Sequence, residues 1–465
     1  MQRSHGTRTR GIEAVPQGPF YEGRFGRMFG KIPTFQQDKD ELRRLGAAMV
    51  ENGEGDLDNP DIPSGYTYVG QFIDHDITFD PSSSLQRMND PEGLVNFRTP
   101  RFDLDSLYGS GPNEDPFMYD QTSGGVKLLV GKVRVNGRDT DEEDLPRNSQ
   151  GRALTGDPRN DENTFVSQLH LAFIKFHNKV VDLVQAEQGL FGDELFKEAQ
   201  RIVRFHYQWA VVNDYLRRTV GEDMLNEVWK AGNNGEPHQI NLRFYRWKVQ
   251  PFMPVEFSVA AYRFGHSQVR PTYKINSVVP ELPTFSSEGD TNPLADFRGF
   301  RSLPQQWTVD WKLFFEIDGS TPQPSRKIDT KLASALTDLP GMPADMESLA
   351  VRNLLRGWRL NLPSGRRVAT AVGETALTRE ELGFEKTGYS GPAPLWYYVL
   401  KEAEIKEGGR RLGPVGGRIV AEVLLGLLKA DPLSFINVEP SWRPDLPSAE
   451  TGQFTMADLV KFATS

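Results

Sequence analysis

The sequence predicts a mainly α-helical protein that forms one large domain with long loops and little β-structure. Three observations predict this fold class. Apolar residues recur every three or four positions in several long stretches, as in helices that pack on a core. Strand-like stretches are few, and no internal repeat or low-complexity linker divides the 465 residues. We therefore expect a single domain over residues 1–465, with residues 1–20 as a loosely ordered N-terminal arm.

The expected elements follow from this spacing along the chain. A strand is predicted over residues 126–135, because Val and Leu are frequent there and Asn136-Gly137 follows as a favoured hairpin turn. The first long helix carries large apolar residues on one face: Phe165, Leu169, Phe173, Phe176, Val180 and Val184. Further helices are predicted over residues 196–218, 255–269, 346–360, 394–405 and 416–428. Stretches with scattered Gly and Pro predict long loops over residues 278–299 and 317–327.

The composition excludes several classes of function. A net charge of −9 argues against a nucleic-acid surface and against a polybasic membrane anchor. The absence of Cys excludes disulfides, zinc–thiolate sites, iron–sulfur clusters and thiolate-bound haem. The basic N-terminus lacks the apolar core of a signal peptide, and no stretch approaches the ~20 apolar residues of a membrane span. We expect a soluble protein, cytoplasmic or exported without a cleaved signal, whose compartment the sequence does not fix.

Two groups of polar residues point to chemistry at a metal centre. Gln71 and His75 are four residues apart and share a helical face, with Asp74 beside them. A neutral histidine can take a proton from one peroxide oxygen and return it to the other, and an arginine such as Arg159 can stabilise the developing charge. Taken alone, Gln71 and His75 could equally be a buried polar pair in a helical core.

The second group lies far downstream, where His266 follows Arg263 by three residues. Asn353 and Arg356 are also three apart, so both can face the same ligand from one helix. An asparagine oxygen can accept a hydrogen bond from an imidazole N–H and so tune a histidine that binds a metal. Taken alone, Asn353 and Arg356 could be ordinary helix surface.

Together these motifs resemble the animal-type haem peroxidase superfamily, which includes myeloperoxidase, lactoperoxidase and cyclooxygenase. The similarity extends from about Gly23 to Arg418, and the chain looks like a compact bacterial member. The resemblance implies a helical haem peroxidase domain that binds haem b. It places the distal residues at Gln71, His75 and the catalytic Arg159, the proximal iron ligand at His266, and its partner at Asn353.

Further haem contacts are implied at four positions. Arg263 and Arg356 match positions near the haem propionates, where cations pair with carboxylates. Asp74 and Glu162 match the two carboxylates that form ester bonds to haem in the family, so covalent attachment is a further expectation. Asn163 stands where myeloperoxidase has the methionine of its sulfonium link, which puts chloride oxidation in doubt.

A calcium site is also implied by the resemblance. Asp76 matches the first calcium ligand of the family, and a loop downstream supplies Thr99, the Arg101 carbonyl, Asp103 and Asp105. Calcium prefers six to eight oxygen ligands, which such a loop can provide. The competing interpretation is a solvated acidic turn.

The resulting hypothesis is a peroxidase that reduces hydrogen peroxide through a ferryl intermediate and serves the response to oxidative stress. Its expected donors are iodide, thiocyanate, bromide and small phenols. One alternative is a fatty-acid dioxygenase of the cyclooxygenase type, which needs a tyrosine three residues before the proximal histidine, where this chain has Arg263. The other is a non-catalytic adhesion protein that binds haem or calcium, which predicts loss of His75 or Arg159, although both are present.

Overall fold

The computed structural model confirms a mainly α fold. It describes residues 23–34, 37–53, 55–79, 96, 98–232, 236–286, 292, 294–337, 339 and 348–465, so the predicted arm over residues 1–20 lies outside the described residues. The long helices are α2 (Gly65–Ile77), α4 (Thr164–Gln188), α5 (Gly192–Ala210), α9 (Leu349–Arg359), α12 (Leu395–Glu407) and α13 (Pro414–Ala430).

Shorter helices connect and flank these. The α-helices among them are α1 (Lys39–Ala47), α3 (Asp105–Tyr108), α6 (Arg217–Val220), α7 (Glu222–Val228), α8 (Val255–Ser258), α10 (Gly365–Val372), α11 (Phe384–Thr387), α14 (Phe435–Val438) and α15 (Met456–Thr464). The 3₁₀ helices are η3 (Pro116–Met118), η4 (Gln121–Ser123), η5 (Pro158–Asp161), η7 (Ala261–Gln268), η8 (Trp311–Leu313) and η9 (Ser334–Leu336), and η6 (Val211–Leu216) is a π-helix.

The strands of the described residues form only two-stranded pairs. The pairs are β1 (Phe25–Gly26) with β7 (Met253–Pro254), β2 (Asp58–Pro63) with β10 (Pro324–Arg326), β3 (Gly131–Val135) with β4 (Arg138–Asp144), β5 (Trp229–Lys230) with β6 (Gln239–Ile240), and β8 (Thr272–Tyr273) with β9 (Leu282–Pro283). The predicted turn is confirmed, since Asn136 and Gly137 both have positive φ between β3 and β4. The strand itself starts only at Gly131, and β10 lies inside a predicted loop.

The helix predicted over residues 255–269 was wrong in form. The α-helical part, α8, ends at Ser258, and the chain bends at Ala260 (φ −130°, ψ −79°) before it continues as the 3₁₀ helix η7. In a 3₁₀ helix the side chains at positions i and i+3 eclipse each other. Arg263 and His266 are therefore carried on the same edge of η7.

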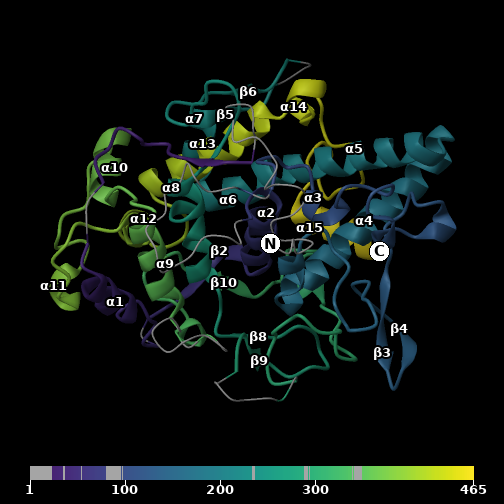
Figure 1. Cartoon of the computed structure of the whole chain (residues 1–465), viewed down its shortest axis with the longest axis horizontal. Coiled ribbons are helices and arrows are strands. Elements are labelled where there is room, and N and C mark those ends of the chain that lie inside the picture. The colour runs from purple at the N-terminus through teal and green to yellow at the C-terminus, as the bar shows by residue number, and fades with distance from the viewer. Residues whose placement is uncertain are drawn as a thin grey trace, which may run out of the picture.

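The core lies between packed helices whose apolar faces were visible in the sequence. Helix α2 is fixed on α4 by two ring pairs, Phe72 on Phe173 and Tyr68 on Phe165, each stacked with centroids 4.4 Å apart. Helix α13 is buried from Val415 to Leu428. Figure 1 shows α1 and α9 to α12 gathered at one end of the long axis, with the β3–β4 hairpin toward the other. In the described part of the chain, no helix is both long and apolar enough to cross a membrane.

Substitution of two glycines by alanine should change the free energy of unfolding in opposite directions. At Gly65, the start of α2, an added Cβ would lie 2.6 Å from both the Phe314 carbonyl oxygen and the Phe315 ring, so Gly65→Ala should lower the free energy of unfolding by about 1–3 kcal/mol. At Gly357, within α9, it would lie 3.4 Å from Leu362, so Gly357→Ala should raise that free energy by up to about 1 kcal/mol. Urea unfolding measures both, and the reverse order would contradict this packing.

Candidate active site

Helix α2 carries His75 into a hydrogen-bonded chain with Asn160 and His170. His75 is 3% exposed, and its Nδ1 lies 2.8 Å from Asn160 Oδ1. The amide oxygen can only accept, so Nδ1 carries the proton and Nε2 keeps its lone pair. The Asn160 amide nitrogen in turn lies 2.9 Å from His170 Nδ1. This series of hydrogen bonds fixes the tautomer in which His75 can act as a base through Nε2.

The environment keeps His75 neutral. Burial, reinforced by the Arg159 charge, lowers the pKa of His75 to about 3. Its Nε2 lies 3.7 Å from Glu162 Oε1, beyond a direct hydrogen bond. A neutral imidazole with an available Nε2 is the form that accepts a proton.

Gln71, Glu162 and Asn163 form one polar group beside His75. The Gln71 amide nitrogen donates to Glu162 Oε1, and Asn163 Nδ2 donates to Gln71 Oε1 at 3.1 Å. Asn163 Oδ1 also caps α4 by accepting from the Val166 amide at 2.9 Å. Burial raises the pKa of Glu162 to about 7. The site can therefore hold a proton on Glu162 near neutral pH.

Arg159 is held in place by Asp157, which caps the 3₁₀ helix η5. Both Arg159 Nε (3.1 Å) and Nη2 (2.9 Å) donate to the Asp157 carboxylate, and Nη2 also donates to the carbonyls of His75 (3.2 Å) and Thr78. The same carboxylate accepts from Arg98 Nη2 at 2.6 Å. Burial opposes the charge on Asp157, but Arg159 and Arg98 outweigh it and hold the pKa of Asp157 well below its usual range.

Asp74 lies on the same helix and faces Arg159. One carboxylate oxygen accepts from the Thr78 hydroxyl at 2.8 Å, and the other lies 3.8 Å from Arg159 Nη1. The structure thus places Asp74 and Glu162 beside the predicted distal residues. Their ester bonds to haem stay a prediction.

The second predicted cluster is also assembled, with Asn353 between His266 and Arg263. The Asn353 amide nitrogen lies 2.7 Å from His266 Nδ1, and its oxygen accepts from Arg263 Nη1 at 3.2 Å. Burial, with the charges of Arg263 and Arg352, lowers the pKa of His266 to about 3, which keeps the imidazole neutral. Neutral imidazole is the form that binds metals.

The orientation of the Asn353 amide differs from the expectation. We expected its oxygen, not its nitrogen, to face His266. The reason is Arg263, which has only donors and therefore attracts the amide oxygen. If Nε2 of His266 bound iron, Nδ1 would carry the proton and would need the oxygen, so the amide plane would have to turn by 180°.

The two clusters meet at a cavity of about 150 Å³. Its walls come from α2, η5, the α8–η7 bend and α9, with these residues: Phe25, Asp74, Thr78, Phe79, Arg159, Ser258, Val259, Arg263, Arg356 and Leu360. Arg356 thus joins Arg263 and Arg159 at one cavity. Residues more than 300 positions apart in the chain, Phe25 and Leu360, face the same space.

The predicted acidic cluster is assembled as well. Carboxylate oxygens of Asp76, Asp103 and Asp105 lie within 4.8 Å of one another. Asp76 is fully buried and neither of its oxygens has a well-formed hydrogen bond. Burial, followed by the charges of Asp103 and Asp105, raises the pKa of Asp76 well above its usual range, and burial and Asp105 raise that of Asp103 to about 7. Thr99 donates its hydroxyl to Asp103 at 2.7 Å.

Arg101 lies in the same loop, and its N–H donates to the Thr99 carbonyl at 2.8 Å. Its carbonyl as a metal ligand stays a prediction. Three carboxylates held this close together repel one another when they are ionised, and a divalent cation would relieve that repulsion. The structure therefore offers an oxygen-rich site next to His75.

Several site residues were not foreseen from the sequence. Asp157 and Asn160 lie two residues before and one residue after Arg159, yet we assigned them no role. Arg98, only 2% exposed, reaches Asp157 and lies 3.3 Å from Asp105. His170 was likewise assigned no functional role. An Asp at the N-cap before Pro158 was the one local signal available.

Comparison with known proteins yields one family and several relatives. The sequence profile described as "Animal haem peroxidase" matches residues 82–364, which is more than half of the chain. The chain is 23% identical to heme peroxidase 2 of Caenorhabditis elegans over 86% of its length and 64% of that protein. It is 25% identical to peroxidasin of Drosophila melanogaster over 63% of its length and 19% of that protein. The chain thus spans less than two thirds of these relatives.

Solved structures share the fold at low sequence identity. Peroxidase A from Dictyostelium discoideum aligns with a TM-score of 0.68 and 15% identity, over 97% of this chain and 95% of that one. A fatty acid alpha-dioxygenase from Oryza sativa aligns with a TM-score of 0.66 and 16% identity, over 93% and 78%. These two neighbours carry different activities in their names, so the fold alone does not choose between them.

Removal of Asp157 should unfold the region around Arg159. Asp157→Ala leaves two largely buried guanidinium groups without their shared carboxylate, so the free energy of unfolding should fall by about 3–5 kcal/mol. The matched control is Asp139→Ala, which removes the exposed partner of Arg134 and should cost less than about 1 kcal/mol. Chemical denaturation compares the two, and similar values would show that Asp157 does not organise the site.

Proposed function

The chain belongs to the animal haem peroxidase family, and from this premise we propose that it is a haem-dependent peroxidase that reduces hydrogen peroxide. Small anions or phenols would be the electron donors. One observation carries the proposal: His75 is held neutral, with its Nε2 available, beside an arginine that faces the same cavity as Arg263 and Arg356. Acid–base transfer on a peroxide needs this combination.

The residues at the cavity fit a haem in their chemistry. His266 offers a neutral imidazole for the iron, and Asn353 lies on its other ring nitrogen. Arg263 and Arg356 supply cations for carboxylates at the haem edge. Ligand sites commonly measure about 300–1,000 Å³, and this cavity is smaller, so binding requires parts of its wall to move. Haem, when bound, supplies the iron centre that takes the oxidising equivalents of the peroxide.

His75 would move the proton. Its Nε2 takes a proton from one oxygen of the peroxide and returns it to the other oxygen, which leaves as water. Asn160 holds Nδ1–H throughout, so the imidazole keeps its orientation while Nε2 gains and loses the proton. Gln71 and Glu162 form the polar wall on this side.

Arg159 would stabilise the negative charge that develops as the oxygen–oxygen bond breaks. Asp157 fixes its Nε and Nη2, which leaves Nη1 as the donor that faces Asp74. A guanidinium group stays charged at any relevant pH and is already oriented, so it needs no rearrangement during the reaction.

We further propose that calcium binds at Asp76, Asp103 and Asp105, with Thr99 and the Arg101 carbonyl as additional ligands. The buried and unsatisfied carboxylate of Asp76 supports this, because such a group is costly without a cation. Asp76 follows His75 directly in α2, so a bound cation would fix the backbone that carries the histidine.

The dioxygenase alternative has less support. Arg263 occupies the position three residues before His266 and is engaged with Asn353 and the Ser258 carbonyl. Tyr262 points elsewhere, with its ring stacked on Phe257 at 4.6 Å. An adhesion protein without turnover would not need the arrangement of His75 and Arg159.

Replacement of His75 tests the proposed proton transfer. His75→Ala should slow the reaction of the haem-loaded protein with hydrogen peroxide by about 10²–10⁴-fold, because it removes the imidazole base. The carboxylate nearest to its Nε2, that of Glu162 at 3.7 Å, is engaged with Gln71. Stopped-flow absorbance gives the rate, and the Soret band reports whether haem is retained. His238→Ala, at a half-buried histidine outside the site, is the matched control. A wild-type rate in His75→Ala would refute the assignment.

Calcium should stabilise the protein through Asp76. Addition of Ca²⁺ after treatment with a chelator should raise the melting temperature, because a ligand that binds only the folded state stabilises it. Asp76→Asn should abolish that rise, whereas Asp115→Asn, in an acidic loop outside the cluster, should preserve it. An equal rise in Asp76→Asn would place the calcium elsewhere.

The donor range should exclude chloride. Asn163 is bound to Gln71 and Val166 and has no thioether sulfur for a sulfonium link, so we expect a weaker oxidant than myeloperoxidase. Iodide, thiocyanate, bromide and small phenols should be oxidised with peroxide at neutral pH, and chloride hardly at all. Steady-state assays across the halides decide this, and efficient hypochlorite production would contradict it.

A further inference from the structure

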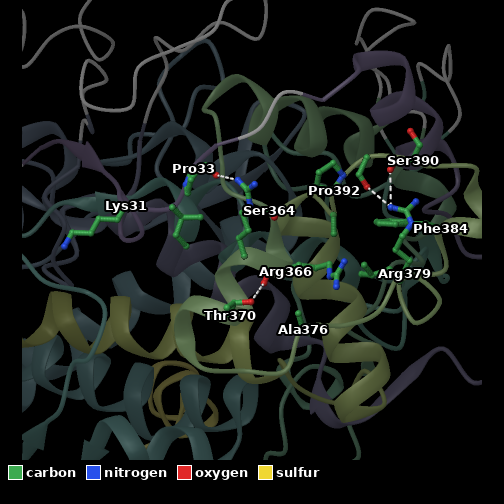
Figure 2. Close-up of a pocket in the computed structure, with 15 residues that line it drawn as sticks. Lys31, Pro33, Ser364, Arg366, Thr370, Ala376, Arg379, Phe384, Ser390 and Pro392 are labelled. Atoms are coloured by element: carbon green, nitrogen blue, oxygen red, sulfur yellow. Dashed lines mark hydrogen bonds between the residues drawn. The ribbon is translucent and has the colours of Figure 1, made fainter.

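A second and larger cavity lies away from the candidate active site. It measures about 660 Å³, within the range of small-molecule sites, and shares no lining residue with the cavity at Arg159. Its walls are the segment from Lys31 to Pro33, the start of α10, α11 and the segment from Ser390 to Ala393. Figure 2 shows these segments around the cavity. The proposed peroxidase activity makes no use of this space.

The cavity is basic, although the whole chain is acidic. Lys31, Arg366, Arg367 and Arg379 line it, and none of the described lining residues is Asp or Glu. The chain as a whole has a net charge of −9. A concave surface with one sign of charge concentrates ligands of the opposite sign.

Neutral groups hold these arginines, so their charge is not cancelled. Arg379 donates to the carbonyls of Tyr389 at 2.8 Å and Ser390 at 3.1 Å, and its guanidinium lies over the Phe384 ring, 5.2 Å from the centroid. Among the described residues, the Arg366 guanidinium has no hydrogen-bond or ion-pair partner. Figure 2 shows Arg366 and Arg379 on the same side of the cavity, with Lys31 apart at the other end.

The start of α10 adds uncharged donors to this side. Ser364 precedes the helix, is 3% exposed, lines the cavity, and makes no side-chain capping bond. The backbone N–H groups of Arg366 and Arg367 lie in the first turn, where a helix offers no acceptor. No described residue outside the helix accepts from them either. A buried hydroxyl and two N–H groups therefore lie open to an anion.

Part of the wall is apolar. Leu382, Phe384 and Ala393 are almost fully buried and line the cavity. An inorganic anion would contact the guanidinium groups and leave these apolar side chains and most of the volume uncovered. The cavity therefore suits a ligand with one anionic end and an apolar body.

We propose that this cavity binds a small organic anion, a carboxylate on an apolar body. The carboxylate would lie against Arg366 and the first turn of α10, and the body against Leu382 and Phe384. The inference stands on the cavity itself and is independent of the proposed peroxidase function.

Calorimetric titration of the full chain as purified tests the site, with octanoate as the probe. Octanoate should bind saturably with one site per chain. Inorganic phosphate, which has charge but no apolar body, and 1-octanol, which has the body but no charge, should bind much more weakly. Arg366→Ala should weaken octanoate binding by about fivefold to tenfold, because it removes a charged partner. Ser364→Ala should weaken it less.

The matched control is Arg138→Ala, an exposed arginine of the β3–β4 hairpin, which should leave the affinity unchanged. Thermal melting of each variant reports on folding. Four results would overturn the proposal: no saturable binding of octanoate, wild-type affinity in Arg366→Ala, equal affinity for 1-octanol, or equal affinity for phosphate.

Discussion

The candidate active site depends on one buried carboxylate, that of Asp157. Fully shielded from water, it binds Arg98 at 2.6 Å and Arg159 at 2.9 Å and begins the helix that carries Arg159. Arg98 also pairs with Asp105, so Arg159, the 3₁₀ helix η5 and the acidic cluster are joined through consecutive ion pairs. A change at either end of this series therefore disturbs the charges along all of it. The geometry around His75 is thus fixed by electrostatics from outside the cavity.

Buried carboxylates elsewhere in the chain show what a purely structural role looks like. Glu256 is fully buried, and its two oxygens accept from the backbone amides of Met28 at 3.0 Å and Phe29 at 3.1 Å. Asp76 is equally buried, but its oxygens face two other carboxylates and lack well-formed hydrogen bonds. A protein does not retain such an unfavourable group for packing, which supports a cation as its partner.

The sequence predicted the elements whose signal is local. The periodicity of residues 165–184 marks α4 to within a few positions, and Asn136-Gly137 marks a hairpin because its backbone conformation is intrinsic to those residues. The form of η7 was not predictable, since the break at Ala260 arises from packing and not from the apolar pattern. The same holds for β10, a three-residue strand that exists only because β2 lies beside it.

The residues of the candidate site likewise divide into those that a local sequence signal predicted and those that it did not. The motifs that contain His75, Arg159 and His266 were recognised, and the structure brings one member of each, Asp74, Arg159 and Arg263, to the same cavity. Asn160 was not, because an asparagine acquires its role only through contact with a histidine 85 positions away. The predicted orientation of the Asn353 amide differs from the one in the structure for a related reason, because Arg263 donates a hydrogen bond to the amide oxygen. The type of a residue predicts which chemistry it can perform, but it does not predict with which neighbour each donor or acceptor forms its hydrogen bond.

The long separation between paired residues also sets an order of events during synthesis. His266 and its partner Asn353 are 87 positions apart, and at about 5–20 residues per second a ribosome needs roughly 4–17 s to make that stretch. The pair of His75 and Asn160 is complete well before His266 is made. The nascent chain can therefore assemble one wall of the cavity early, whereas the opposite wall can form only after α9 has been synthesised. The space between the two walls is therefore closed only after α9 has been made, when α2, α4 and α5 already exist.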